Sequence, residues 1–227
     1  MSDIFREVDE DIRKEKYRRL WDRYGIWAIM VAVLIVAGTG GYRGWIYWQD
    51  TQSQNAGDMF FEAVTLSEEG NVDEALAIFA ELQDSVGGYP QIARLREATE
   101  LARTGRQTEA LGIFDSLSRD SNVDRALQSV ASIRAGYLAV DLEDYTGVAD
   151  RVEGLTGPDD PFRAAARELL ALSAWNNGDV ETARRWISAI QDDPATPTGV
   201  TQRVSILSEV IRARYGAPSE QGTGASE

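Results

Sequence analysis

The chain has 227 residues, with 37 acidic and 23 basic side chains, and it contains neither cysteine nor histidine. Disulfide bonds, thiolate chemistry, serine–histidine triads and zinc sites built from cysteine or histidine are therefore excluded. Residues 49–227 carry 30 acidic and 15 basic side chains. Such a charge repels nucleic acid and anionic lipid headgroups, although an acidic surface also serves solubility alone.

Residues 1–23 are predicted to form a basic, amphipathic helix. Ile4, Val8 and Ile12 recur at four-residue spacing, which places them on one helix face. Two interpretations stay open, a helix that lies at the membrane interface and a helix that docks onto a cytosolic partner. Six basic residues lie close to the apolar run that follows, namely Arg13, Lys14, Lys16, Arg18, Arg19 and Arg23.

Residues 24–44 are predicted to form one transmembrane helix. The stretch YGIWAIMVAVLIVAGTGGY contains 19 uncharged residues, and at about 1.5 Å per residue it nearly spans a hydrocarbon core of about 30 Å. A cleavable signal peptide is the competing interpretation, but its apolar region is shorter, about 7–15 residues, and ends in small residues. Here Arg43, Gly44 and Trp45 stand where a cleavage site would lie. Aromatic residues that would anchor the helix at the two headgroup levels are Trp21, Tyr24, Trp27, Tyr42, Trp45 and Trp48.

The basic residues near this segment predict its orientation. Six of them precede it closely and only Arg43 follows closely, and positively charged flanks remain in the cytoplasm. The N-terminus is therefore expected in the cytoplasm and the C-terminal part on the far side of the membrane. Residues 45–54 are interpreted as a juxtamembrane linker.

Residues 55–215 are predicted to be an all-α domain of stacked helical hairpins. Residues 63–82 and 98–117 are identical at nine of 20 positions at an offset of 35 residues. In each copy a glycine ends the first helix, and an alanine and a phenylalanine share one face of the second helix. A single hairpin cannot bury that face alone, so the hairpins have to stack. Phe79 and Phe114 are expected to be equivalent core residues.

Two weaker copies follow, near residues 136–155 and 171–190. In the first of them Glu143 takes the place of the turn glycine. A final amphipathic helix over residues 199–215 is expected to cap the stack. The tail 216–227 is rich in Gly, Ser and Glu and is expected to be disordered.

The small–Gly–Ala–Phe positions over roughly residues 55–190 resemble the tetratricopeptide repeat family, although its usual tryptophan and terminal proline are missing. The whole layout, MSDIFREVDEDIRKEKYRRLWDRYGIWAIMVAVLIV followed by GYRGWIYWQ and helical repeats, is similar to the YfgM-type family of ancillary SecYEG translocon subunits. This resemblance implies a Gram-negative inner membrane protein with a cytoplasmic N-terminus and a periplasmic domain. It also implies a partnership with the SecYEG translocon and periplasmic chaperones.

In the resembled repeat family the first helix of each hairpin lines a concave groove, and here that lining would be apolar. Contiguous exposed apolar surface usually marks a binding site, in this case for an extended or helical segment of a partner. The alternative is that the final helix, or tighter packing of the stack, buries these side chains. The predicted groove residues are Phe60, Val64, Ile92, Leu95, Ile133, Tyr137, Val140, Leu172 and Trp175.

Three classes of function are compatible with this layout to different degrees. The first is a scaffold or adaptor at the translocation site, and the second is an envelope-organising protein linked to cell-wall or division machinery. An enzyme is disfavoured, because the pairs Asp159–Asp160 and Asp192–Asp193 flank prolines as turn residues do. The sequence also lacks a P-loop, a dinucleotide-binding glycine pattern and a calcium-binding loop. No cofactor and no metal ion are expected.

Overall fold

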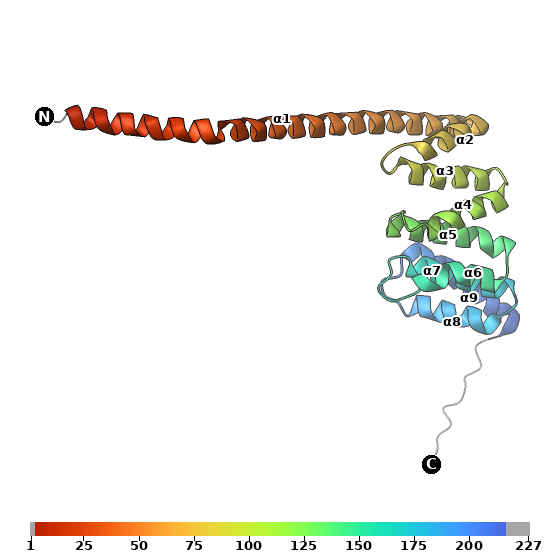
Figure 1. Cartoon of the computed structure of the whole chain (residues 1–227). Coiled ribbons are helices and arrows are strands. Elements are labelled where there is room, and N and C mark those ends of the chain that lie inside the picture. Colours follow the sequence, from red (N-terminus) through yellow and green to blue (C-terminus); the bar gives the residue numbers. More distant parts are fainter. Residues whose placement is uncertain (1–2, 217–227) are drawn as a thin grey trace, which may run out of the picture. The chain divides into compact units, whose positions relative to one another are not determined.

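A computed structural model describes the backbone of residues 3–216 and the side chains of residues 21–27 and 29–216. The predicted amphipathic character of residues 1–23 lies mostly outside the described side chains, and the predicted tail, beyond Gly216, lies outside the described residues. Every regular element within the described range is a helix, so the predicted all-α fold class is confirmed (Figure 1).

The chain divides into two compact units, residues 1–56 and 57–227, which we describe separately. Helix α1 (Asp3–Glu69) provides all of the described part of the first unit and the first helix of the second. Residues 45–54, interpreted from the sequence as a linker, are helical and belong to α1. They contain neither glycine nor proline, so nothing in this segment interrupts the helix.

In the first unit the apolar side chains of α1 point into open space. Leu34 is 65% exposed and Val36 is 71% exposed, whereas the core helix of a folded protein buries such side chains. From Trp21 onward α1 is long and apolar enough to cross a membrane.

The second unit is a stack of four helical hairpins and a final helix (Figure 1). The end of α1 pairs with α2 (Val72–Glu81), α3 (Tyr89–Arg103) with α4 (Gln107–Arg119), α5 (Arg125–Leu142) with α6 (Tyr145–Val152), and α7 (Arg163–Asn176) with α8 (Val180–Gln191). The final helix is α9 (Thr198–Tyr215), and short 3₁₀ turns follow α2 (Leu82–Asp84) and α6 (Glu153–Leu155). From α2 onward each helix packs against the next, and α7 also packs against both α5 and α9.

Three of the four hairpin turns depend on a glycine with a left-handed backbone. Gly70, Gly105 and Gly178 have φ angles of 90°, 85° and 79°, a region that side chains with a Cβ rarely adopt. In each turn the residue after the glycine donates its N–H to a carbonyl five residues earlier, as in a Schellman motif. These donor and acceptor pairs are Asn71 to Leu66 (2.8 Å), Arg106 to Leu101 (2.8 Å) and Asp179 to Ala174 (2.9 Å).

The third hairpin turns differently because Glu143 occupies the glycine position. Its φ is −133°, and Asp144 caps α6 by accepting the N–H of Gly147 at 3.0 Å. The Glu143 carboxylate accepts from the guanidinium of Arg151, which also binds Asp115 of α4 through two hydrogen bonds of 2.8 Å. The third hairpin therefore lacks the glycine turn, and it has instead an ion pair that joins it to the second hairpin.

The repeat register read from the sequence agrees with the core. Phe79 and Phe114 are 0% and 2% exposed, and Ala75 and Ala110 are completely buried beside them. Small residues at these positions let the two helices of a hairpin approach closely. The final helix α9 buries Val200, Val204 and Ile211 against α7 and α8 and so closes the end of the stack. Its remaining surface is mostly exposed, as expected of a cap.

Candidate functional site

The nine predicted groove residues all lie on the first helices of the hairpins, but their exposure differs. Tyr137 is exposed, at 45% of its surface, and Ile133 is buried. Ile133 contributes little accessible surface, because it belongs to the core where α5 packs against α4, α6 and α7. The other seven are half-buried, namely Phe60, Val64, Ile92, Leu95, Val140, Leu172 and Trp175.

At the beginning of the stack, Phe60 belongs to an aromatic cluster. Its ring centroid lies 5.8 Å from that of Phe79 and 6.2 Å from that of Tyr89. Such tilted aromatic pairs stabilise packing beyond the area that they bury. Phe60 therefore contributes mainly to the fold of the first hairpin.

In the middle of the stack, Tyr137 borders a cavity of about 370 Å³ between α3, α4 and α5. Its lining residues are Thr99, Ala102, Phe114, Arg134, Tyr137 and Leu138. The sequence identified Tyr137 as a groove residue but missed the cavity. The available signal was Arg134, a cation three residues before Tyr137 on an otherwise apolar stretch of helix.

A buried acid lies near this cavity. The carboxylate of Glu168 on α7 is 4% exposed and accepts two hydrogen bonds from Arg203 of α9. Burial, together with the negative charge of Glu168, raises the pKa of Tyr137 above its usual value, although Arg203 and Arg134 act against this. The Tyr137 hydroxyl is protonated at neutral pH, as any tyrosine with a pKa of about 10 or more is, and can donate a hydrogen bond.

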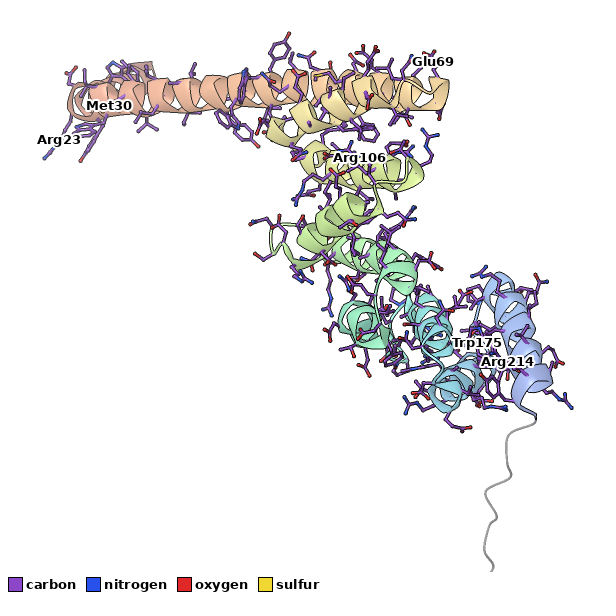
Figure 2. The ribbon with its side chains drawn as sticks, turned by 90° about the vertical axis from the view of Figure 1, so that its right-hand side faces the viewer. Arg23, Met30, Glu69, Arg106, Trp175 and Arg214 are labelled. Carbon is purple, nitrogen blue, oxygen red and sulfur yellow. The ribbon has the colours of Figure 1, made fainter. Side chains whose placement is uncertain are left out.

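At the end of the stack, α9 covers Trp175. The ring of Tyr215 is perpendicular to that of Trp175 at 5.9 Å, and the guanidinium of Arg214 lies 5.8 Å from the Trp175 ring centroid (Figure 2). At this end of the stack, the final helix thus covers a predicted groove residue, which is the alternative to an open groove. The accessible part of the predicted groove is centred on Tyr137.

The six predicted anchor residues, Trp21, Tyr24, Trp27, Tyr42, Trp45 and Trp48, are all exposed on α1. Only Trp45 and Trp48 contact each other among them, with ring centroids 5.5 Å apart. These side chains are therefore available to an apolar or interfacial environment outside the chain.

The acidic pairs act as turn residues. Asp160 accepts the N–H of Phe162 at 2.8 Å, and Asp193 accepts the N–H of Ala195 at 3.0 Å. Arg163, assisted by Arg167 and the Ala195 N–H, lowers the pKa of Asp193 to about 2. No group of three or more acidic side chains within the described residues is arranged to hold a metal ion.

Comparison with known proteins agrees with this architecture. Residues 18–197 match the model of the tetratricopeptide repeat-like domain family, and the chain belongs to this family. Among characterised proteins, it is similar to the ancillary SecYEG translocon subunit of Escherichia coli (strain K12). The two are 23% identical over 184 residues, which are 78% of this chain and 88% of the relative. The resemblance inferred from the sequence layout is thus confirmed as a distant relationship over most of the chain, whereas no solved structure matched significantly.

Proposed function

We propose that this chain is a membrane-anchored scaffold that binds other proteins beside the SecYEG translocon. The observation that carries the proposal is the sequence similarity to an ancillary SecYEG translocon subunit over 88% of that relative. It is supported by the order of parts in this chain, an apolar helix followed by a tetratricopeptide-like stack. In this role the domain assists the biogenesis of secreted or membrane proteins together with periplasmic chaperones.

The anchoring part of the proposal rests on α1. Its apolar side chains are exposed, and a lipid bilayer is the environment that stabilises such a surface. The aromatic residues before and after the apolar run suit the two headgroup regions. The charged and bulky residues after the run, Arg43 and Trp45, favour retention of the helix over its cleavage.

The basic residues before the span support an orientation with the N-terminus in the cytoplasm and the stack on the far side of the membrane. The similarity to an Escherichia coli protein supports the inner membrane of a Gram-negative cell, with the stack in the periplasm. A reporter fused after Glu227 would then be active only outside the cytoplasm. Protease added to spheroplasts would digest the stack and protect about the first 45 residues, the length of the cytoplasmic segment and a span of about 20 residues. Digestion of the stack only by protease on the cytoplasmic side would show that the orientation is the opposite one.

The binding part of the proposal rests on the surface around Tyr137. Tyrosine and tryptophan are enriched at binding hot spots, where truncation weakens binding by about 2 kcal/mol or more. Tyr137 is exposed beside a cavity, while Trp175 is covered by α9. We therefore expect Tyr137 to be the main contact with a partner.

Photo-crosslinking in native membranes tests the function. A crosslinking amino acid at position 137 of the full chain is expected to capture translocon subunits or periplasmic chaperones. The matched control is Thr146, an exposed residue of the second helix α6. Capture of cell-wall or division proteins at position 137 would instead favour an envelope-organising role, and equal capture at both positions would remove the role of this surface.

A further inference from the structure

Arg134 lines the cavity beside Tyr137, and its guanidinium has no partner among the described residues. Arg134 is exposed, and it forms no ion pair or hydrogen bond with any other described side chain. The arginines that face neighbouring acids are paired, as Arg103 with Glu100 at 2.8 Å shows. In a region with twice as many acidic as basic residues, Arg134 is therefore a cation available to an incoming group.

The rest of the cavity wall is largely apolar. Ala102, Phe114 and Leu138 contribute hydrocarbon, and the Thr99 hydroxyl already donates to the carbonyl of Leu95 at 2.8 Å. The Tyr137 hydroxyl donates to no other described residue, and it remains protonated. The cavity thus combines apolar walls with two hydrogen-bond donors, from Arg134 and Tyr137.

The size of the cavity limits what can enter it. A volume of about 370 Å³ is at the lower end of the range of ligand pockets, about 300–1,000 Å³. It accommodates a side chain with its adjoining polar group but not an element of a folded domain. Because Tyr137 at the border of the cavity is exposed, a chain segment that lies against Tyr137 can reach the cavity.

We infer that this cavity binds a segment of a partner protein in which a large apolar side chain lies next to a carboxylate. The apolar side chain packs between Phe114 and Leu138, and the carboxylate accepts hydrogen bonds from Arg134 and the Tyr137 hydroxyl. Arginine suits this role because its planar guanidinium can bind a carboxylate through two parallel hydrogen bonds. The inference rests on the proposed function and deepens it, since it states the chemistry of the partner at the same surface.

The net negative charge of residues 49–227 adds selectivity. Exposed charges are largely screened beyond about 8 Å at physiological ionic strength, so a single carboxylate in contact with Arg134 is favoured. A segment with many acidic residues would be repelled by the net negative charge of the domain. The preferred segment therefore carries one carboxylate beside an apolar residue.

Peptide binding to the purified full-length chain in lipid nanodiscs tests the inference. The probes are three fluorescent peptides of equal length that carry Phe–Glu, Phe–Gln or Ala–Glu within an otherwise alanine and serine sequence. Wild-type protein is expected to bind the Phe–Glu peptide about tenfold more tightly than either of the others, the effect of one hydrogen bond to a charged group or one buried side chain. Arg134→Gln should bind the Phe–Glu and Phe–Gln peptides equally, and Tyr137→Phe should retain part of the preference.

The matched control is Arg125→Gln, an exposed arginine of the same helix outside the cavity, which should behave as wild type. Equal melting temperatures of the variants would show that the fold is unchanged.

Failure of the Phe–Glu peptide to bind at millimolar concentration, or an unchanged preference in Arg134→Gln, would overturn the inference. If Arg134→Gln still crosslinks to the translocon through position 137, the proposed function survives while this subsite fails. If the wild type discriminates between the peptides but no translocon or chaperone crosslink forms, this subsite survives while the proposed function fails.

Discussion

Arg203 of α9 donates hydrogen bonds to both carboxylate oxygens of Glu168 on α7, one of them with an Nη2–Oε2 distance of 2.7 Å. The two residues are 35 positions apart, and the carboxylate is almost completely buried while the guanidinium is half-exposed. The final helix is thus held to the stack by a charged contact as well as by Val204 and Ile211.

Replacing Arg203 by Met should lower the free energy of unfolding by about 2 kcal/mol, because a buried carboxylate loses its charged partner. Urea denaturation followed by circular dichroism measures this. Arg212→Met is the control, since Arg212 is exposed and lies 3.9 Å from an exposed Glu209, a kind of pair that contributes about 0–1 kcal/mol. Recovery of stability in the double variant Arg203→Met, Glu168→Met would support the explanation, and a loss equal to that of the control would contradict it.

Truncation of the two repeat phenylalanines should be costly. Phe79→Ala and Phe114→Ala should each lower stability by about 3–5 kcal/mol, because both side chains fill the core and leave a cavity when removed. Phe61→Ala is a matched control on α1, with a side chain that is 72% exposed, and its cost should be small. A loss below about 1 kcal/mol at both core positions, far less than buried aromatics lose, would show that the repeat register is wrong.

Substitution of a turn glycine should destabilise the fold, because its left-handed backbone conformation is strained for a residue with a Cβ. Gly105→Ala is expected to destabilise by about 1 kcal/mol, since φ is 85° while no atom lies within 4 Å of the added Cβ. Gly112→Ala, within α4 and equally free of close neighbours, should stabilise by about 0.5–1 kcal/mol, because alanine favours a helix. Melting temperatures of the two variants should therefore move in opposite directions, and shifts of the same sign would refute this.

Asp193 should make stability depend on pH in the acidic range. Hydrogen bonds from Arg163 and from the Ala195 N–H, with the charge of Arg167, lower the pKa of Asp193 to about 2, below its unfolded value of about 3.9. Its contribution is complete above the unfolded pKa and is lost as pH falls through the folded one. The difference in melting temperature between wild type and Asp193→Asn should be constant above about pH 5 and disappear near pH 2. A difference that stays constant over the whole range would exclude this role for Asp193.

Much of the fold could be predicted because its determinants are local and repeated. The glycine turns and the alanine–phenylalanine positions recur at fixed spacing, so one hairpin predicts the next. The helix across residues 45–54 was less evident, since an aromatic stretch that becomes polar after an apolar run is equally compatible with a linker. Local sequence shows that such a segment can be helical but not where the helix ends.

The candidate site was harder to predict because exposure depends on neighbouring helices. Ile133 and Tyr137 are four residues apart on α5 and share a helix face by periodicity, yet one is buried and the other exposed. Trp175 is covered by Tyr215, a residue 40 positions later in the chain. Contacts between residues so far apart in the chain depend on how the hairpins stack. They cannot be predicted from the residue spacing within one helix.

The ion pairs of Arg151 bear on how the stack comes apart. Where each repeat contacts only its neighbours, opening can begin at either end and proceed one hairpin at a time. Arg151 joins α6 to α4 across the intervening α5, so the third hairpin cannot open without exposing charges held by the second. The segment from α4 to α6 therefore behaves as one cooperative unit, and its amides should exchange with solvent more slowly than those of α2 or α9.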